Sequence, residues 1–252
     1  MSVDASEIES VRAWVDAATR VVVLTGAGIS TESGIPDFRG PQGVWTRDPQ
    51  AEKLSNIHYY MRDPEIRKAA WLSRLDHPAW GARPNAGQRA LVALEARGKL
   101  HALITQNIDE LHQIAGNSPE KVIEVHGTVR KVVCMDCGMT ASMAVALDRV
   151  RGGEADPHCR VCDGILKSAT ISFGQNLVPE VIDRALRCAG EADLFFSIGT
   201  SLQVYPIAGA VEVARQAGAR LVILNAEATP FDSIADAIFR APIGTVLPRL
   251  LA

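Results

Sequence analysis

The sequence has 252 residues, of which 47% are hydrophobic and 22% charged. This balance excludes a disordered chain, because enough apolar side chain is present to form a large core. A formal net charge of −3 disfavours specific nucleic-acid binding, which needs a basic face. No apolar run approaches the roughly 20 residues of a membrane helix, and the acidic start lacks the basic region of a signal peptide. We therefore expect a cytoplasmic protein with no membrane partner.

The first predicted elements are a helix and a short buried strand. Asp4 and Glu7 have the spacing of a capping box, and the apolar residues that follow lie on one helical face. The strand, residues 21–24, ends abruptly at Thr25-Gly26. The same pattern of an apolar run followed by small or polar residues returns at 103–107, 194–201 and 221–225.

Helices are predicted between these strands at 85–97, 179–189 and 206–217. The first has Asn85 and Gln88 at capping-box spacing, and the other two begin with Pro179 and Pro206. Buried strands that alternate with helices predict an α/β fold with a doubly wound parallel sheet. The carboxyl ends of such strands share one edge, where open α/β sheets bind ligands.

Two stretches interrupt this alternation. Residues 40–84 are rich in Trp, Tyr, Arg and Pro, which indicates a helical insertion or lid. Residues 131–166 contain four of the five cysteines, in two Cys-x-x-Cys pairs. In a cytoplasmic chain such pairs predict a metal site before they predict disulfides. Four thiolates suit tetrahedral zinc and leave no open coordination position, so we expect a structural zinc ion held by Cys134, Cys137, Cys159 and Cys162.

The segment after the first strand, Gly26-Ala27-Gly28-Ile29-Ser30, resembles a turn that binds a dinucleotide. Thr31 stands where the usual fingerprint has a third glycine, so an ordinary Rossmann dehydrogenase is a poor match. A tight structural turn is the alternative. Residues 30–40 are expected to form a long and nearly helix-free loop, and such loops often close over a ligand.

Polar residues also follow two further strands. Two amides and a carboxylate occur in Gln106-Asn107-Ile108-Asp109, and His126-Gly127 follows the apolar run at 122–125. Amides and carboxylates can hold ribose hydroxyls or a carboxamide, and a histidine with a pKa near 6.5 suits a general base. The other five histidines are interpreted as structural or surface residues.

Taken together, these motifs resemble the signature of the sirtuins, NAD-dependent protein deacylases. The matching segments, in the family's order, are residues 26–30, 33–39, 106–109, 126–127, the two cysteine pairs, 199–201, 204–206 and Asn225. The resemblance covers the chain from about residue 10 to about residue 248. It implies a Rossmann-like NAD-binding domain of residues 1–39, 85–130 and 167–252, with the helical 40–84 and zinc-binding 131–166 modules as a smaller domain.

The resemblance also implies roles for individual residues. His126 and Asn107 would be catalytic. The NAD-binding residues would be Gly26, Ala27, Gly28, Thr31, Asp37, Phe38, Arg39, Gln106, Asn107, Ile108, Asp109, His126, Gly199, Thr200, Ser201 and Asn225. Phe173, Gly174 and Val204 would clamp an acyl-lysine peptide as an added strand.

The implied reaction starts when the acyl oxygen attacks the ribose carbon and nicotinamide leaves. His126 then takes a proton from the ribose hydroxyls, and the products are free lysine, nicotinamide and O-acyl-ADP-ribose. Protein mono-ADP-ribosyl transfer, a zinc-ribbon binding module and an inactive NAD sensor are the alternatives. The acidic charge balance disfavours the binding module, and Asn107, Asp109 and His126 disfavour the sensor.

The acyl group is the least determined part of this interpretation. Family members that prefer succinyl- or malonyl-lysine carry a Tyr-x-x-Arg pair, and Trp71 and Arg74 align with it here. Arg74 could pair with an acyl carboxylate, whereas Trp71 lacks the phenol hydroxyl. Packing of Trp71 in the lid with a solvated Arg74 is equally compatible. We expect a preference for acetyl-lysine and leave acidic acyl groups open.

Overall fold

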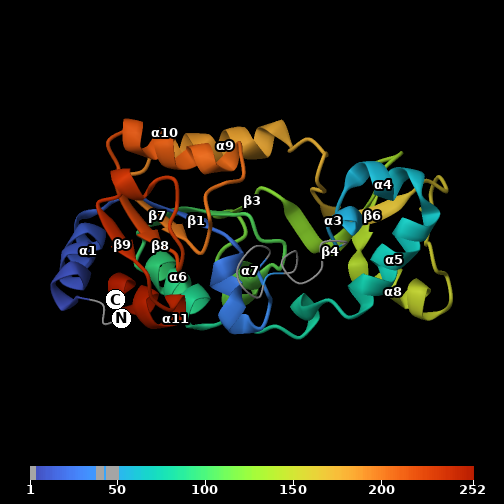
Figure 1. The fold of residues 1–252 in the computed structure, drawn as a ribbon, viewed down its shortest axis with the longest axis horizontal. Helices are drawn as coiled ribbons and strands as arrows, with labels where there is room; N and C mark the ends of the chain where they lie inside the picture. The colour runs from blue at the N-terminus through green and yellow to red at the C-terminus, as the bar shows by residue number, and fades with distance from the viewer. Residues whose placement is uncertain (1–3, 38–42, 44–50) are drawn as a thin grey trace.

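The computed structural model describes residues 4–37, 43 and 51–252, and it contains two sheets (Figure 1). The larger one is parallel and has the strand order β3-β2-β1-β7-β8-β9. In that order its strands are Val122–Glu124, Leu100–Thr105, Val21–Thr25, Leu194–Ile198, Arg220–Leu224 and Ala237–Phe239. The doubly wound parallel sheet expected from the sequence is therefore confirmed.

Helices cover both faces of this sheet. One face packs against α1 (Ala5–Ala17), α6 (Ala86–Ala96) and α11 (Ile243–Leu251), and the other against α9 (Pro179–Gly190) and α10 (Ala210–Gln216) (Figure 1). The shorter elements are α7 (Leu111–Ala115) and the 3-10 helices η1 (Ala27–Ser33), η3 (Ile207–Gly209) and η4 (Asp232–Ile234). Strands with two covered faces have no solvent side, which explains their continuous apolar runs.

The predicted helix boundaries hold where local chemistry sets them. Asn85 accepts hydrogen bonds from the backbone N–H groups of Gly87 and Gln88, and the Gln88 side chain accepts from the Asn85 N–H, so the predicted capping box is present. The helix expected at 206–217 is shorter, because its first turn is the 3-10 helix η3 and α10 begins only at Ala210.

The smaller sheet is antiparallel and has the order β5-β4-β6, with bounds Thr140–Ser142, Gly127–Cys134 and Leu166–Thr170. Around it lie α3 (Ala51–Leu54), α4 (Ile57–Arg62), α5 (Pro64–Leu75), η2 (Pro78–Trp80) and α8 (Met143–Arg151) (Figure 1). Trp71 from α5 is fully buried in one apolar cluster with Val132, Met143 and Leu166. The helical segment before α6 and the cysteine-containing segment after β3 therefore share one apolar core.

Further contacts join the helical and cysteine-containing segments. The Tyr60 hydroxyl donates to the Leu166 carbonyl at 2.8 Å, and the Arg67 guanidinium pairs with Asp156 at 2.8 Å. Both pairs are largely removed from solvent, so they fix the segments against each other more strongly than a surface ion pair would. Among the described residues, no helix combines the length and apolar character needed to cross a membrane.

Candidate functional site

The candidate site begins where β1 and β7 lie side by side in the centre of the parallel sheet. The chain leaves these strands in opposite lateral directions, toward β2 and toward β8, which makes their carboxyl ends the switch point of the fold. The two following loops are hydrogen-bonded to each other. The Gly26 N–H donates to the Ile198 carbonyl at 3.0 Å, and the Gly28 N–H donates to the Gly199 carbonyl at 2.9 Å.

Glycine is required at this contact because two backbones touch. A Cβ atom on Gly28 would lie 2.7 Å from Gly199 Cα, and one on Gly199 would lie 2.5 Å from the Ile29 nitrogen. Gly199 also has a φ of 62°, which side chains disfavour. The two interpretations of this glycine segment, a tight structural turn and a ligand-binding turn, are thus compatible. Close packing of the glycines shapes the edge on which a ligand would rest.

The expectation of a nearly helix-free loop at 30–40 is wrong in its first part. Residues 27–33 form the 3-10 helix η1, in which the Thr31 hydroxyl donates to the Gly28 carbonyl at 2.9 Å. The helix ends at Gly34, whose φ of 86° leaves the helical region. At the start of η1 the Gly28 N–H is bonded to the Gly199 carbonyl and the Ile29 N–H to the Gly26 carbonyl, so these two backbone donors do not contribute to the binding of an anion such as a pyrophosphate.

Ser30 is the centre of a buried hydrogen-bond network at this edge. Its hydroxyl donates to the Asp109 carboxylate at 2.7 Å and accepts from the Asn107 side-chain amide at 3.1 Å. Burial raises the pKa of Asp109 above its ordinary value, although the Leu111 N–H and the Ser30 hydroxyl oppose this shift. The network therefore holds two of the predicted site residues, Asn107 and Asp109, in a fixed orientation before any ligand binds.

His126 lies at the same edge in a defined tautomer. Its Nδ1 atom is 3.0 Å from the Gln106 carbonyl oxygen, which can only accept, so Nδ1 carries the hydrogen and Nε2 keeps a lone pair. Burial lowers the pKa of His126 below 6.5, and the bond to Gln106 only partly opposes this effect. The Gln106 side-chain amide in turn donates to the Thr200 hydroxyl at 2.9 Å. His126 is thus arranged as a neutral base.

The remaining predicted cofactor residues are distributed around the same strand ends. Ala27 begins η1, Ile108 accepts a backbone bond from Val129, and Ser201 is half-buried after β7. Asn225 follows β8, and its side-chain amide donates to the Glu227 carbonyl at 2.9 Å. Asp37 is half-buried at the end of a described stretch, whereas Phe38 and Arg39 lie outside the described residues.

This donor set fits NAD. Side-chain amides, hydroxyls and a carboxylate suit the carboxamide and ribose hydroxyls of such a molecule. The residues would bind and orient the dinucleotide at the switch point. When bound, NAD supplies an ADP-ribosyl group to which an acyl group can be transferred.

The four cysteines of the smaller sheet come together as one cluster. Their sulfur atoms all lie within 4.8 Å of one another, with 3.5 Å between Cys134 and Cys162 and 3.8 Å between Cys137 and Cys159. Four thiolates at about 2.3 Å from a tetrahedral zinc ion would be roughly 3.8 Å apart. The cluster is therefore consistent with structural zinc, as the sequence predicted, and it offers no position for a substrate.

The predicted substrate residues fall into two groups. Phe173 and Gly174 are exposed after β6, and Val204 is half-buried in the loop after β7. By contrast, Trp71 is fully buried in the core of the smaller sheet. The Arg74 guanidinium donates to the Ser168 hydroxyl at 3.0 Å and lies over the rings of Tyr60 and Trp71.

Sequence reasoning missed the roles of Ser30 and His112. His112 Nε2 is 3.0 Å from the Thr25 hydroxyl, which donates to the Thr105 hydroxyl at 2.8 Å, and Thr105 accepts from the Asn107 N–H at 3.1 Å. Burial lowers the pKa of His112 to about 4, so this histidine is neutral. The available sequence signal was a threonine at the end of each of two buried apolar strands. A buried hydroxyl requires a polar partner, so these threonines indicated a polar side chain nearby.

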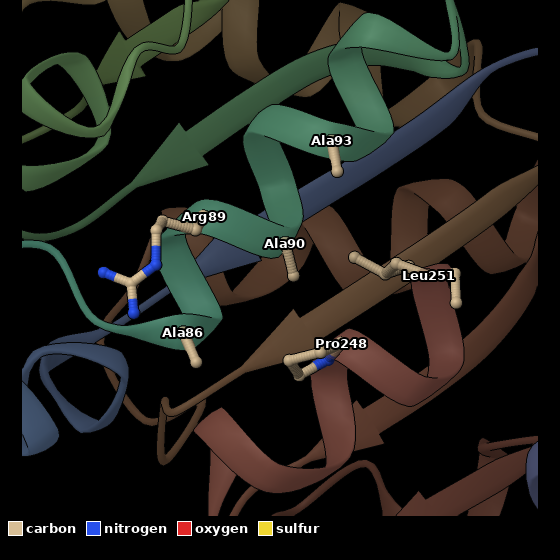
Figure 2. Close-up of a pocket in the computed structure, with 7 residues that line it drawn as sticks. Ala86, Arg89, Ala90, Ala93, Pro248 and Leu251 are labelled. Carbon is tan, nitrogen blue, oxygen red and sulfur yellow. The ribbon is translucent and has the colours of Figure 1, made fainter.

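A groove elsewhere on the molecule does not belong to this site. It has a volume of about 320 Å³ and lies between α6 and α11, where Ala86, Ala90 and Ala93 face Pro248 and Leu251 (Figure 2). Its lining is almost entirely apolar and includes none of the predicted site residues. We therefore place the candidate site at the strand ends.

The fold and this edge define an α/β protein of the dinucleotide-binding class with an additional four-cysteine module. A model of the Sir2 family matches residues 26–206. The chain is 53% identical over 231 residues to the NAD-dependent protein deacetylase 2 of Streptomyces coelicolor, covering 92% of this chain and 96% of that protein. It is 42% identical over 254 residues to the NAD-dependent protein deacetylase 1 of Pyrobaculum aerophilum, covering 100% and 97%.

Solved structures agree with these relatives. A Sir2 structure with a deacetylated p53 peptide and 3′-O-acetyl ADP-ribose superimposes with a TM-score of 0.88 at 32% identity, covering 97% of each chain. A complex of Sir2 with a p53 peptide and NAD+ gives a TM-score of 0.86 at 33% identity, again covering 97% of each chain. The chain belongs to the Sir2 family, the sirtuins.

Proposed function

We propose that this protein is an NAD-dependent protein-lysine deacetylase. It would convert acetyl-lysine, NAD and water into free lysine, nicotinamide and O-acetyl-ADP-ribose. Family membership and the curated relatives named as NAD-dependent protein deacetylases support the reaction class. The observation that carries the proposal is the neutral His126, whose Nε2 lone pair lies at the sheet edge that also presents Asn107 and Asp109.

The residues of this chain would divide the work as follows. Gly26, Gly28 and Gly199 shape the edge on which the dinucleotide rests, and the bonds from Ser30 hold Asn107 and Asp109 toward it. His126 accepts a proton at Nε2 while its Nδ1–H stays bonded to the Gln106 carbonyl. Because His126 has to be neutral, activity is expected to fall as the pH drops through its lowered pKa.

The remaining site roles rest on the family pattern. Ala27, Thr31, Asp37, Phe38, Arg39, Ile108, Thr200, Ser201 and Asn225 are proposed to contact NAD, and Phe173, Gly174 and Val204 are proposed to bind the peptide as an added strand. The Phe173 backbone already exchanges bonds with the loop before α4, since its N–H donates to Ser55 and its carbonyl accepts from Ile57, both at 2.9 Å. Ser172 is engaged as well, because its N–H donates to the Gln175 side-chain oxygen at 3.2 Å and its carbonyl accepts from the Gln175 N–H at 2.9 Å. Peptide pairing is therefore proposed to use Gly174.

Mass spectrometry of an acyl-peptide panel, with and without NAD, tests the proposal. Acetyl-, succinyl- and malonyl-lysine versions of one peptide are compared, and released nicotinamide and the acylated nucleotide are measured in the same sample. We expect equal amounts of nicotinamide and O-acetyl-ADP-ribose only when NAD is present. Transfer of labelled ADP-ribose to the protein fraction without loss of the acetyl group would instead support mono-ADP-ribosyl transfer and contradict the proposal.

Acetyl-lysine is proposed as the preferred substrate because of how Trp71 and Arg74 are placed. Trp71 is fully buried in the small-sheet core, and the Arg74 guanidinium is engaged by the Ser168 hydroxyl and two aromatic rings. One observation favours a second candidate, an acidic acyl group: Arg74 is half-buried, so a carboxylate could replace the Ser168 hydroxyl as its partner. A faster turnover of the succinyl peptide than of the acetyl peptide would reverse our choice.

Two further proposals concern organisation and place in the cell. The NAD-binding domain is proposed to comprise residues 1–39, 85–130 and 167–252, and the smaller domain residues 40–84 and 131–166. The contacts of Trp71, Tyr60 and Arg67 with the cysteine-containing segment support the pairing of the two modules. A cytoplasmic location without specific nucleic-acid binding is proposed from the charge balance and cysteine usage.

A further inference from the structure

Lys167 on β6 is a lysine without any solvent-exposed surface, which is rare because lysine is almost never fully buried. Its Nζ atom donates to the Ser168 carbonyl at 2.9 Å, to the Thr170 carbonyl and to the Ser172 hydroxyl at 3.3 Å. A charged ammonium has three N–H donors, whereas a neutral amine has two. The three acceptors therefore match the charged form, and they all belong to the segment of residues 168–172.

The same segment needs this support because the strand ladder is irregular there. β6 pairs regularly with β4 from Leu166 to Ser168, but the register then shifts before the next pair, Thr170 with Gly127. An interrupted ladder leaves backbone carbonyls without their strand partners. The Lys167 ammonium supplies donors to the Ser168 and Thr170 carbonyls at this interruption.

A second cation holds the segment from the opposite module. Arg74 on α5 donates to the Ser168 hydroxyl at 3.0 Å, and that hydroxyl is 2.9 Å from the Thr170 hydroxyl. Burial and the nearby Arg74 lower the pKa of Lys167 to about 7. Burying one cation near another costs stability, so the arrangement requires an explanation beyond the stability of the sheet.

The position of the segment supplies that explanation. Its end is bonded to His126, because the Ile171 N–H donates to the His126 carbonyl at 2.8 Å. Phe173 and Gly174, the proposed peptide-binding residues, follow immediately, and the Phe173 backbone is bonded to Ser55 and Ile57. A single short stretch therefore joins the proposed proton acceptor to the proposed peptide-binding strand.

We infer that Lys167 is a positioning residue for deacetylation, because its ammonium fixes residues 168–172 so that His126 and the peptide-binding strand keep one relative position. The inference rests on the proposed function. Loss of the ammonium would loosen the segment and misplace the acyl group relative to the edge of the sheet, and small displacements of this kind lower rates strongly. The hydrogen bonds of Lys167 described above do not reach the loops after β1 and β7, which are proposed to bind NAD. We therefore expect NAD binding to be unaffected.

The test compares Lys167→Met, Lys167→Arg and the control Lys131→Met, which removes an exposed lysine from β4 of the same sheet. Steady-state kinetics use an acetyl-lysine peptide and NAD, and hydrogen exchange follows residues 168–175. For Lys167→Met we expect a higher peptide KM and a lower kcat, so that kcat/KM for the peptide falls by roughly tenfold to hundredfold. The KM for NAD should not change, and amide hydrogen exchange in the segment should become faster. Lys167→Arg keeps several charged donors, so it should recover most of the kcat/KM and most of the exchange protection. Lys131→Met should match the unaltered protein.

The inference is overturned if folded Lys167→Met keeps the kcat, peptide KM and exchange of the unaltered protein. It is also overturned if activity falls only in proportion to the folded fraction, because Lys167 would then serve stability alone. If Lys167→Met does not fold, Lys167→Arg decides: recovery of exchange protection and peptide KM supports the inference, and fast exchange in the folded Arg variant contradicts it. Failure of the proposed function is distinct, since the unaltered protein would then release no nicotinamide.

Discussion

The carboxyl edge of the parallel sheet and the smaller cysteine-containing sheet hold their polar groups in different ways. At the edge, hydrogen bonds of Ser30 with the Asp109 carboxylate and the Asn107 amide, together with backbone contacts between Gly28 and Gly199, fix residues that follow the strand ends. In the smaller sheet, four thiols converge and the ammonium of the buried Lys167 donates to carbonyls of its own segment. The first region is held by contacts between neighbouring strand ends, whereas the second depends on a buried ammonium and on a cluster of thiols suited to zinc.

This difference predicts how each region fails. Removing one hydrogen bond from the edge should leave the sheet folded and weaken the binding of NAD. Removing a thiolate from the cluster should release a module whose apolar core contains few large side chains, among them Trp71, Met143 and Leu166. The following predictions separate these two outcomes.

The largest effect is expected from Cys159→Ser, which removes a buried sulfur from the four-cysteine cluster. A structural zinc ion contributes on the order of 10 kcal/mol to folding in small modules. We expect zinc content to fall and amide exchange in residues 131–166 to become fast, while β1, β2 and β7 keep their protection. Cys188→Ser is the matched control, because Cys188 lies on α9 outside the cluster. Slow exchange in a zinc-free Cys159→Ser variant would contradict the structural role of the metal.

The next effect concerns the chemical step at the edge. His126→Ala should lower kcat by about 10²–10⁴-fold, the usual contribution of general acid–base catalysis, with little change in NAD affinity. His101→Ala is the control, since His101 lies on β2 of the parallel sheet but pairs with Glu191 away from the carboxyl ends of the strands. Kinetics with the acetyl peptide and calorimetry with NAD measure the two quantities. Full deacetylation by His126→Ala would remove the mechanism.

A pH effect follows from the buried His112. Its pKa is about 4 in the folded protein and about 6.5 in an unfolded chain, so the unfolded state binds a proton first as the pH falls. His112 therefore contributes its full stability above pH 6.5 and loses it between pH 6.5 and about 4. The shift corresponds to about 3 kcal/mol.

Urea unfolding at several pH values measures this contribution. His112→Gln should flatten the loss of stability between pH 6.5 and 4, although His77 and His126, whose pKa values are also lowered, will keep part of it. The half-buried His101, which pairs with Glu191, provides the control substitution. An unchanged pH slope in His112→Gln would show that the Thr25–His112 contact does not hold the neutral imidazole in solution.

Much of the edge could be predicted from sequence because its signals are local. A strand that ends in glycine, amide or histidine places those residues at the ligand edge once the sheet is known to be parallel, as for Gly28, Asn107 and His126. The cysteine pairs were equally readable from their spacing. The sequence did not reveal the 3-10 helix at residues 27–33, where both helix and loop are compatible with small and hydroxyl-bearing residues.

Contacts between segments that are distant in the sequence could not be predicted from local patterns. Nothing near Lys167 indicates that its ammonium is enclosed, because the enclosure depends on the register shift between β4 and β6. The Trp71 ring could equally have lined a pocket, and only the packing of α5 against the smaller sheet decides its place. Ser30 likewise gains its importance from Asp109, Asn107 and Gln88, which come from two later parts of the chain.

The smallest predicted effect is also the most direct comparison of the two regions, because each contains an asparagine that caps a helix. Asn85 caps α6, and its amide also donates to the Ile29 carbonyl at 2.7 Å and to the Ser33 hydroxyl at 2.9 Å, both in η1. Asn56 caps α4 through the His58 N–H and forms a bridge with Phe173. Either change to Ala should cost about 1 kcal/mol of stability.

The kinetic consequences should differ even though the stability losses are similar. Asn85→Ala loosens η1, so NAD KM should rise by roughly fivefold while peptide KM stays constant, as expected for about 1 kcal/mol of lost support. Asn56→Ala disturbs the residues bonded to Phe173, so peptide KM should rise and NAD KM should stay constant. Thermal unfolding and two-substrate kinetics of both variants make the comparison. If both variants raised the same KM, the edge and the peptide-binding segment could not be independent, and the division of labour between the two regions would be wrong.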